Sequence, residues 1–228
     1  MSKIRAVLFD FGGTLDGNGI HWRERTYRFI RCGHPEINRK EFDRADHAAV
    51  EQFIADGKAP TLNLRESADA IATGIYERLG LNLAEKNRYI DHFCRGVAES
   101  LNLNRRWLTT LGSRYQLGVI SNNFGNAHGW CNEFGLSPLL DVVIDSTVVG
   151  VWKPEPEIFR AALFALGISP HETIYVGDSY SHDVCGAKGV GMWTAWLVGG
   201  EEKVCPDPSI VDVQLANIQD LERFLSQR

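Results

Sequence analysis

Four short apolar segments of this 228-residue chain lead to polar residues that could act together in catalysis. The first segment ends in Asp10 and the second ends in Ser121. The fourth ends in Asp178, with Asp183 five residues further on, and the third feeds a loop that reaches Lys153. Carboxylates, a hydroxyl and an ammonium group suit one ligand in particular, which is a phosphoryl group beside a divalent cation.

The role of each group follows from its chemistry. A hard cation such as Mg²⁺ prefers oxygen ligands, which Asp10 and Asp178 would supply. Two carboxylates about 4 Å apart repel each other by roughly 4 kcal/mol at an effective dielectric constant near 20, and a cation would remove that conflict. Ser121, Asn122 and Lys153 would hold the phosphate oxygens and stabilise charge in the transition state. A metal-bound aspartate can also act as a covalent nucleophile.

Each of these groups alone is common in ordinary turns, so the elements that position them carry the prediction. The segments predicted as strands are Ile4–Asp10, Leu117–Ile120, Val142–Ile144, Thr173–Val176 and Met192–Val198. The helices predicted among and after the later strands are Glu155–Leu166, Asp183–Lys188 and Ile218–Leu225. Alternating strands and helices are typical of a parallel sheet covered on both faces. Ligands of such sheets bind beyond the carboxyl ends of the strands.

After the first strand the chain changes to a helical pattern, from about Gly17 to Ser100. Apolar residues three or four positions apart predict the helices His21–Arg31, Asn38–Ala55, Asn63–Leu79 and Leu83–Leu101. We therefore predict an α/β fold with a doubly wound parallel sheet, formed by residues 1–16 and 101–228. Residues 17–100 are predicted to form an inserted, all-helical domain.

The composition is that of a globular protein, with 44% hydrophobic residues, 23% charged residues and a formal net charge of −5. The acidic balance argues against a nucleic-acid partner, and no apolar run approaches the roughly 18 residues of a membrane span. The first residues lack the pattern of a signal peptide, so we expect a soluble cytoplasmic protein. The five cysteines include no C-x-x-C pair and favour neither a disulfide framework nor a zinc site.

The charges are unevenly divided between the two predicted parts. Residues 17–100 hold 13 Lys+Arg and 13 Asp+Glu, which leaves 11 basic and 16 acidic residues for the rest of the chain. The whole acidic excess therefore lies in the predicted core, which also holds Asp10, Asp178 and Asp183. We expect one bound Mg²⁺ to neutralise part of this excess.

Four sequence motifs carry a resemblance to a known family. They are DFGGTL at residues 10–15, VISN at 119–122, KPEPEIF at 153–159 and VGDSYSHD at 176–183. Together they resemble the four motifs of the haloacid dehalogenase superfamily. The resemblance extends over essentially the whole chain, since a helical insertion between the first two motifs is similar to the C1-type cap of that superfamily.

The resemblance implies a Rossmann-like core, bound Mg²⁺ and a role for each motif residue. It implies that Asp10 is the catalytic nucleophile and that Lys153 and Ser121 hold the phosphoryl group and the nucleophile. The metal ligands would be Asp10, Asp178 and the backbone carbonyl of Gly12. The supporting residues would be Asp183 and Thr14.

The chain departs from this pattern at Gly12. Phosphatases of the superfamily carry a second aspartate at this position, which protonates the leaving group and then activates water. General acid–base assistance is typically worth about 10²–10⁴ in rate, so an alkyl phosphate should be hydrolysed poorly unless another group serves. Asp16 and His21 are candidates, although the simpler interpretation of each is a solvated loop residue.

Three functions are compatible with these residues. The leading prediction is a Mg²⁺-dependent phosphatase that hydrolyses a small phosphorylated metabolite through an aspartyl-phosphate on Asp10. A second possibility is a catalytically impaired protein of the same fold that binds a phosphorylated ligand or a partner. The third is a 2-haloacid dehalogenase, although the resemblance implies that such enzymes usually lack the Gly-Asp present here at Asp178. The sequence leaves open the substrate and the choice between monomer and homodimer.

Overall fold

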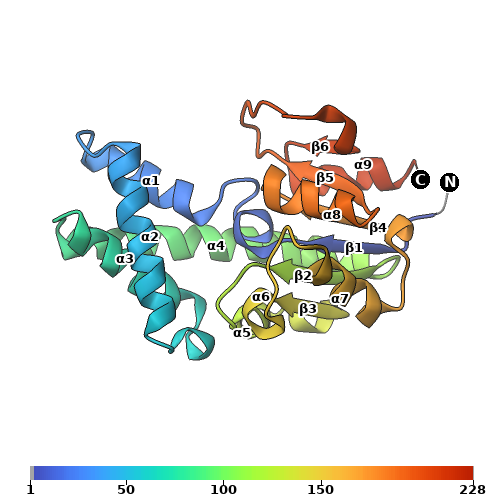
Figure 1. Cartoon of the computed structure of the whole chain (residues 1–228), viewed down its shortest axis with the longest axis horizontal. Helices are drawn as coiled ribbons and strands as arrows, with labels where there is room; N and C mark the ends of the chain where they lie inside the picture. Colours follow the sequence, from blue (N-terminus) through green and yellow to red (C-terminus); the bar gives the residue numbers. More distant parts are fainter. Residues whose placement is uncertain (1–2, 228) are drawn as a thin grey trace.

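The structure, a computed structural model, describes residues 3–227. Six strands form one sheet in which every strand pair is parallel. They are β1 (Ala6–Phe9), β2 (Gln116–Ser121), β3 (Val142–Asp145), β4 (Thr173–Gly177), β5 (Trp193–Leu197) and β6 (Val213–Leu215). The sheet lies in one half of the elongated molecule, and a group of helices occupies the other half (Figure 1).

The strand order is β3-β2-β1-β4-β5-β6, so the chain winds outward in both directions from the β1–β4 pair. In such sheets the ligand binds beyond the carboxyl ends of the strands at the point where the order reverses. The register places Phe9 of β1 beside Val119 of β2 and Val176 of β4. The polar residues that follow these three strands are therefore brought together at one edge of the sheet.

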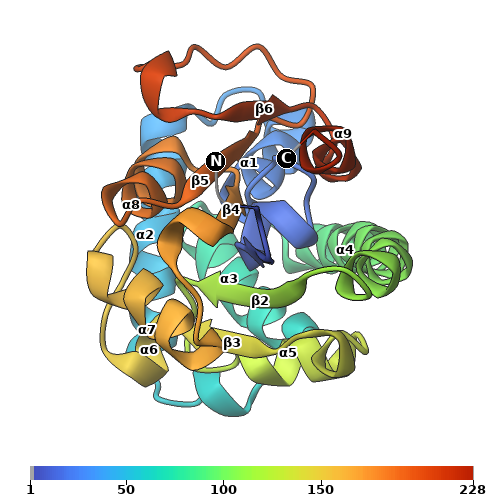
Figure 2. The same ribbon diagram turned by 90° about the vertical axis from the view of Figure 1, so that its right-hand side faces the viewer.

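Helices cover both faces of the sheet. One face carries α7 (Pro156–Leu166) and α8 (Cys185–Gly189), and the other carries α4 (Leu83–Gly112), α5 (Ala127–Glu133) and α9 (Leu221–Leu225) (Figure 2). A further short helix, α6 (Ser146–Val149), follows β3. The core residues accordingly form two main clusters, one for each face.

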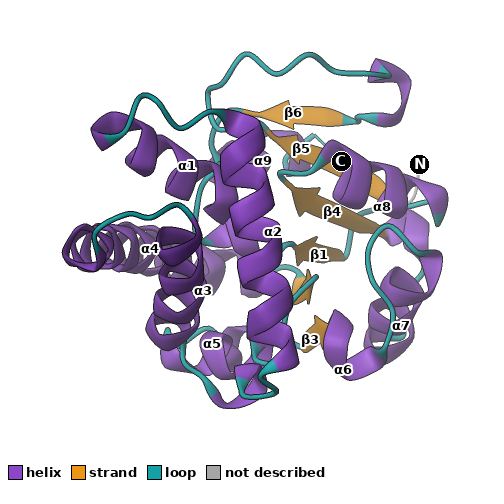
Figure 3. Cartoon of the chain, turned by 60° about the vertical axis from the view of Figure 1, so that its left-hand side comes forward, coloured by secondary structure: helices purple, strands orange, loops and turns teal. Residues whose placement is uncertain are grey.

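The helical half consists of α1 (Trp22–Gly33), α2 (Arg39–Ala55), α3 (Leu64–Arg78) and the first part of α4. These helices lie beyond the carboxyl ends of the strands (Figures 1 and 3). Asparagine side chains cap the starts of three of them, at Asn38, Asn63 and Asn82. Each cap accepts a hydrogen bond from a backbone N–H of the first turn, which satisfies a donor that has no partner within the helix.

The α/β fold with a doubly wound parallel sheet is confirmed. The expected helix Leu83–Leu101 continues to Gly112, so α4 runs from the helical half onto the sheet as a single 30-residue helix. The predicted boundary between residues 100 and 101 lies inside it. Buried apolar residues continue at helical spacing, with Leu101, Leu108 and Leu111 fully buried. The sequence pattern missed β6, α5 and α6, which are too short to show a clear periodicity.

Within residues 3–227, none of the helices combines the length and the apolar character that crossing a membrane requires.

Candidate active site

Lys153 lies at the centre of a buried group of polar side chains. Its Nζ atom donates hydrogen bonds to Oδ1 of Asp10 at 2.6 Å and to Oδ1 of Asp183 at 2.7 Å. It also lies 3.1 Å from the hydroxyl of Tyr175. Lys153 and Asp10 are 5% and 6% exposed, so both ion pairs are almost completely removed from water. The structure thus brings together groups from β1, from the loop after β3 and from the segment after β4.

Burial and the neighbouring charges shift the pKa values of these groups. Burial raises the pKa of the Asp10 carboxyl to about 7, although Lys153 opposes this effect. Burial, together with Asp10 and Asp183, raises the pKa of Asp178 well above its usual range. Burial alone would lower the pKa of Lys153, but Asp10 and Asp183 raise it well above its usual value. The negative charge of the buried carboxylates therefore exceeds the positive charge beside them, and a bound cation would balance it.

Three carboxylates have the arrangement that a cation needs. Asp10, Asp178 and Asp183 each offer an oxygen, and these atoms lie within 4.8 Å of one another. In the described part of the chain, the hydrogen bonds of Lys153 join Asp10 and Asp183 but not Asp178. A site of carboxylate oxygens with one side left to water suits Mg²⁺, which is commonly bound through one or two carboxylates. The residues present therefore fit the expected metal.

The turn that follows β1 packs directly against Asp178. A Cβ atom at Gly13 would lie 2.7 Å from Oδ2 of Asp178, and Gly13 has a φ of +90°, so both space and backbone conformation require glycine here. Thr14 donates a hydrogen bond to Oδ1 of Asp178 at 3.3 Å. The side chain of Asn104 on α4 donates to the carbonyl of Leu15 at 2.6 Å and anchors the end of the turn. Thr14 thus contacts Asp178, and its supporting role in the site stays a prediction.

Asp183 supports the site from the segment after β4. Its Oδ2 atom accepts a hydrogen bond from the backbone N–H of Ser179 at 2.9 Å, while its Oδ1 atom faces Lys153. A Cβ atom at Gly177 would lie 2.3 Å from the Asp183 carboxyl group. Only glycine therefore allows this close approach, which explains why β4 ends in Gly177-Asp178.

Ser121 and Asn122 line the same cavity as Asp10 and Lys153. Asn122 makes two hydrogen bonds with the backbone of Lys153, since its Nδ2 donates to the carbonyl at 3.0 Å and its Oδ1 accepts from the N–H at 2.8 Å. These bonds position the loop that carries Lys153. Direct contact of Ser121 and Asn122 with a phosphate group stays a prediction.

The expectation that Asp16 is a solvated loop residue is wrong. Asp16 is fully buried, and its carboxylate accepts hydrogen bonds from the N–H of Gly13 at 2.6 Å and from Arg25 at 2.8 Å. It also accepts a hydrogen bond from the indole of Trp22. Trp22 and Arg25 belong to α1, so the hydrogen bonds of Asp16 link the first helix of the insertion to the turn after β1. It does not line the cavity of Asp10, and both of its carboxylate oxygens already accept hydrogen bonds.

His21 lies at the start of α1 and lines the cavity that contains Asp10, Gly12 and Lys153. Its side chain accepts a hydrogen bond from the N–H of Arg23 at 3.3 Å and caps the helix. Although part of the His21 side chain is exposed, the surrounding protein desolvates its imidazole and lowers its pKa, and Asp16 acts in the opposite direction. His21 is thus a titratable group of the cavity outside the four motifs.

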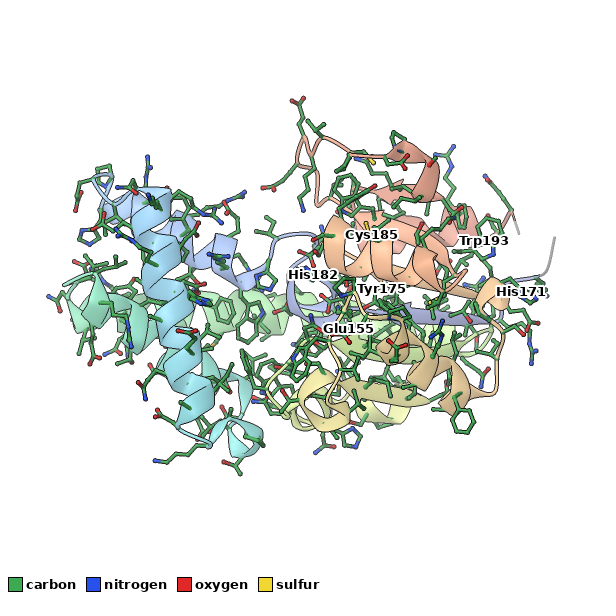
Figure 4. The ribbon with its side chains drawn as sticks, in the orientation of Figure 1. Glu155, His171, Tyr175, His182, Cys185 and Trp193 are labelled. Atoms are coloured by element: carbon green, nitrogen blue, oxygen red, sulfur yellow. The ribbon has the colours of Figure 1, made fainter. Side chains whose placement is uncertain are left out.

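Sequence reasoning missed one residue beside this cavity and two residues in its wall. Tyr175 was assigned only to a buried strand, yet its hydroxyl contacts Lys153 and donates to the carbonyl of Ile120 at 2.8 Å. A tyrosine in an otherwise apolar strand was the available signal, because its buried hydroxyl needs a partner. His182 and Arg23 also line the cavity. Figure 4 shows Tyr175 and His182 on the side of the sheet that faces the helical half, and His171 at the opposite end.

The whole cavity has a volume of about 440 Å³. It lies between the turn after β1, the carboxyl ends of β2 and β4, and the start of α1. It therefore lies at the point where the strand order reverses, and its walls carry carboxylates, an ammonium group, a guanidinium group, two hydroxyls and two imidazoles. This set can bind a phosphoryl group beside a cation and can offer a carboxylate for attack.

Comparison with known proteins agrees with the resemblance carried by the four sequence motifs. The family model of haloacid dehalogenase-like hydrolases matches residues 4–191. The pyrophosphatase PpaX of Halalkalibacterium halodurans is 38% identical, over 96% of this chain and 97% of the relative. The glyceraldehyde 3-phosphate phosphatase of Methanocaldococcus jannaschii is 36% identical, but over only 39% of this chain and 39% of the relative.

Solved structures share the fold of this chain. The hydrolase YfnB of Bacillus subtilis, whose crystal structure contains magnesium, has a TM-score of 0.59 and 18% identity, over 99% of this chain and 100% of the other. A 2-haloacid dehalogenase from Pseudomonas syringae pv. tomato has a TM-score of 0.56 and 19% identity, over 98% of this chain and 99% of the other. These likenesses concern the fold alone.

Proposed function

This chain belongs to the family of haloacid dehalogenase-like hydrolases, and we propose that it is a Mg²⁺-dependent phosphatase of a small phosphorylated metabolite. The observation that carries the proposal is the contact of Lys153 with both Asp10 and Asp183, beside the carboxylate of Asp178. The names of the relatives add support, since the pyrophosphatase matches over nearly its full length and others are phosphatases that match in part.

Asp10 acts as the nucleophile in this proposal. One of its carboxylate oxygens attacks the phosphorus atom, the bond from phosphorus to the leaving oxygen breaks, and an aspartyl-phosphate forms. Lys153 holds Oδ1 of Asp10 at 2.6 Å and thereby fixes the plane of the carboxylate. The ammonium group of Lys153 and the hydroxyl of Ser121 stabilise charge on the phosphoryl oxygens. Water then hydrolyses the aspartyl-phosphate and restores Asp10.

The cation would be held by Asp10, Asp178 and the backbone carbonyl of Gly12. When bound, Mg²⁺ supplies positive charge to the phosphoryl oxygens and to the crowded carboxylates. The residues that build its site, Thr14 and Asp183 among them, orient Asp178 and Lys153 as described above.

His21 takes over part of the acid–base work that Gly12 cannot perform. The lowered pKa of His21 favours its neutral imidazole. Its Nδ1 atom, which accepts the N–H of Arg23 at 3.3 Å, is the basic nitrogen and can take a proton from the attacking water once it releases that bond. His21 lines the same cavity as Asp10, so the attacking water and the imidazole would share this space. We therefore assign His21 to hydrolysis of the aspartyl-phosphate and leave the first step without a strong acid.

The alternative of a binding protein with impaired turnover rests on Gly12, since no carboxylate stands at this position to protonate a leaving group. The dehalogenase alternative rests on fold alone. Asp178 disfavours it, because a third carboxylate beside Asp10 would add repulsion to a reaction that uses no cation.

The test of this proposal is phosphate release from a panel of phosphate monoesters by purified protein, with and without Mg²⁺. Asp10→Asn should lower the rate by more than about 10³-fold, since it removes the nucleophile and keeps the shape of the side chain. Glu157→Gln is a suitable control, because Glu157 lies on the exposed surface of α7 and pairs with the exposed Arg160. Activity that survives in Asp10→Asn would show that Asp10 is not the nucleophile.

A further inference from the structure

A second cavity opens beside the one that contains Asp10. It has a volume of about 300 Å³ and lies between the helical half and the sheet. Gly12, His21, Arg23, Ser121 and Asn122 line both cavities, so the two adjoin at these residues. A molecule with its phosphoryl group beside Asp10 would therefore extend into this second space.

Aromatic and aliphatic side chains form most of the wall of the second cavity. Trp22 stacks on Trp130 with ring centroids 5.2 Å apart and an interplanar angle of 18°. The remaining apolar lining residues are Val50, Ala68, Ile71, Ala72, Ile75 and Phe124. Such a wall favours a hydrophobic group with flat faces.

The charged groups of the wall are already paired. Arg23 lies 3.0 Å from Asp43 and 3.1 Å from Asp46, so its charge is balanced within the helical half. His21 has a lowered pKa and is neutral near pH 7. Among the described lining residues, no cation is therefore left to balance a carboxylate or a second phosphate group on the ligand.

The polar groups of the wall are mostly engaged as well. The hydroxyl of Thr26 donates to the carbonyl of Trp22 at 2.9 Å and lies 2.6 Å from the hydroxyl of Tyr89. Two buried atoms are exceptions. Nδ2 of Asn123 has no hydrogen-bond partner, and Nε of Arg23 makes no hydrogen bond although it lies 3.1 Å from Asp46. A single uncharged acceptor on the ligand would satisfy Asn123.

Gly12 stands at the junction of the two cavities. A Cβ atom at this position would point toward the indole of Trp22, 3.8 Å from its Nε1 atom. A longer side chain there would narrow the passage between the site of Asp10 and the apolar wall. The absence of a side chain at residue 12 thus keeps the two cavities joined.

We propose that the substrate is a phosphate monoester whose organic part is apolar and uncharged, and that this part occupies the cavity beside Trp22 and Trp130. A cavity of about 150 Å³ holds benzene, so 300 Å³ would hold a group of roughly two fused rings. This inference rests on the proposed phosphatase function but names a different substrate class from the pyrophosphate of the relative PpaX.

The test compares three phosphonates, which the enzyme cannot hydrolyse, by calorimetry in Mg²⁺. 1-Naphthylmethylphosphonate carries the apolar group, methylphosphonate lacks it, and methylenediphosphonate carries a second anionic group. The naphthyl compound should bind about 100-fold more tightly than methylphosphonate, because its rings leave water for the apolar wall. It should also bind more tightly than methylenediphosphonate. Equal affinities, or a preference for methylenediphosphonate, would overturn the proposal.

A variant that fills the cavity tests its location. Ala72 is 2% exposed and lines the cavity, whereas Ala70 is exposed on the same helix and does not. Ala72→Phe should bring the affinity ratio of the naphthyl compound to methylphosphonate close to one, and Ala70→Phe should keep the wild-type ratio. If Ala72→Phe does not fold, Ile71→Trp fills the same space from a half-buried position. A ratio that persists in the filled variant would place the apolar group elsewhere.

The two proposals fail in different ways. Selective binding of the naphthyl compound without phosphate release from 1-naphthyl phosphate would support the proposed binding of an apolar group in the second cavity. It would contradict the phosphatase function. Release of phosphate from several monoesters, together with equal binding of the phosphonates, would support the phosphatase function. It would overturn the proposal that an apolar group of the substrate occupies the second cavity.

Discussion

Lys153 and Asp183 are joined by a 2.7 Å hydrogen bond although 30 residues separate them in the chain. Their side chains are 3% and 1% exposed, so the pair is buried. The contact links the loop after β3 to the segment after β4 and directs the ammonium group toward Asp10. Its place in the centre of the site means that removal of either charge should affect both stability and catalysis.

Lys153→Met should destabilise the protein strongly. It leaves Asp10 and Asp183 buried without their counter-ion, and breaking a buried pair in this way costs about 3–5 kcal/mol. Arg160→Met is the matched control, because Arg160 and Glu157 form an exposed pair on α7 and such pairs contribute about 1 kcal/mol or less. Urea denaturation of both variants measures the difference. Similar small losses for the two variants would show that the Lys153 pairs contribute little to stability.

Addition of Mg²⁺ should raise the thermal stability of the wild-type protein. A ligand that binds only the folded state stabilises it by about 2.7 kcal/mol at 100 times its dissociation constant. Asp178→Asn should remove most of this effect, since it replaces a charged ligand by a neutral one. Asp56→Asn, at an exposed position after α2, should keep it. An unchanged response to Mg²⁺ in Asp178→Asn would exclude Asp178 as a ligand.

Much of the site was predictable from the sequence because Asp10 and Asp178 directly follow strands, and these two residues needed only the rule that parallel strands end at the same edge. Lys153 lies further from its strand, in the loop after α6, and was found through the motif that contains it. Asp16 was misjudged because its donors, Trp22 and Arg25, come from the first helix of the insertion and reach it through tertiary packing. Local sequence pattern carries no information about such partners.

The limits of the fold prediction have a similar origin. The end of α4 was placed too early because polar residues such as Asn104 interrupt its apolar pattern. In the structure Asn104 is buried and donates to the carbonyl of Leu15, so its polarity serves the turn after β1. The strand β6 has only three residues and is defined by its pairing with β5.

His21→Gln should slow hydrolysis of the aspartyl-phosphate and lower kcat by about 10²-fold. The pKa of His21 is lowered, so its imidazole is neutral at pH 7 and gains a proton only as the pH falls through that lowered value. The kcat of the wild-type protein should therefore decline on the acidic side, and the variant should lose this dependence. A pH profile of kcat, with quenched samples to detect the accumulated aspartyl-phosphate, makes the measurement. If the kcat of His21→Gln shows the same decline at acidic pH, another group causes that decline.

Gly12→Asp should fold and should gain activity toward alkyl phosphates. Gly12 has a φ of −76°, which any residue adopts, and an added Cβ atom would meet nothing closer than Trp22 at 3.8 Å. The new carboxyl group can protonate the leaving oxygen, and such assistance is worth about 10²-fold or more in rate.

The neighbouring glycine provides the control for this substitution. Gly13→Ala should destabilise the protein, because Gly13 has a φ of +90° and its Cβ atom would lie 2.7 Å from Asp178. Phosphate release from an alkyl phosphate, measured beside the thermal stability of both variants, separates the two effects. In Gly12→Asp the preference for 1-naphthylmethylphosphonate should also fall, because the new side chain narrows the passage toward Trp22. A stable Gly12→Asp variant with no gain in rate would show that a missing carboxyl group at residue 12 does not limit turnover, and that the glycine is present for the passage alone.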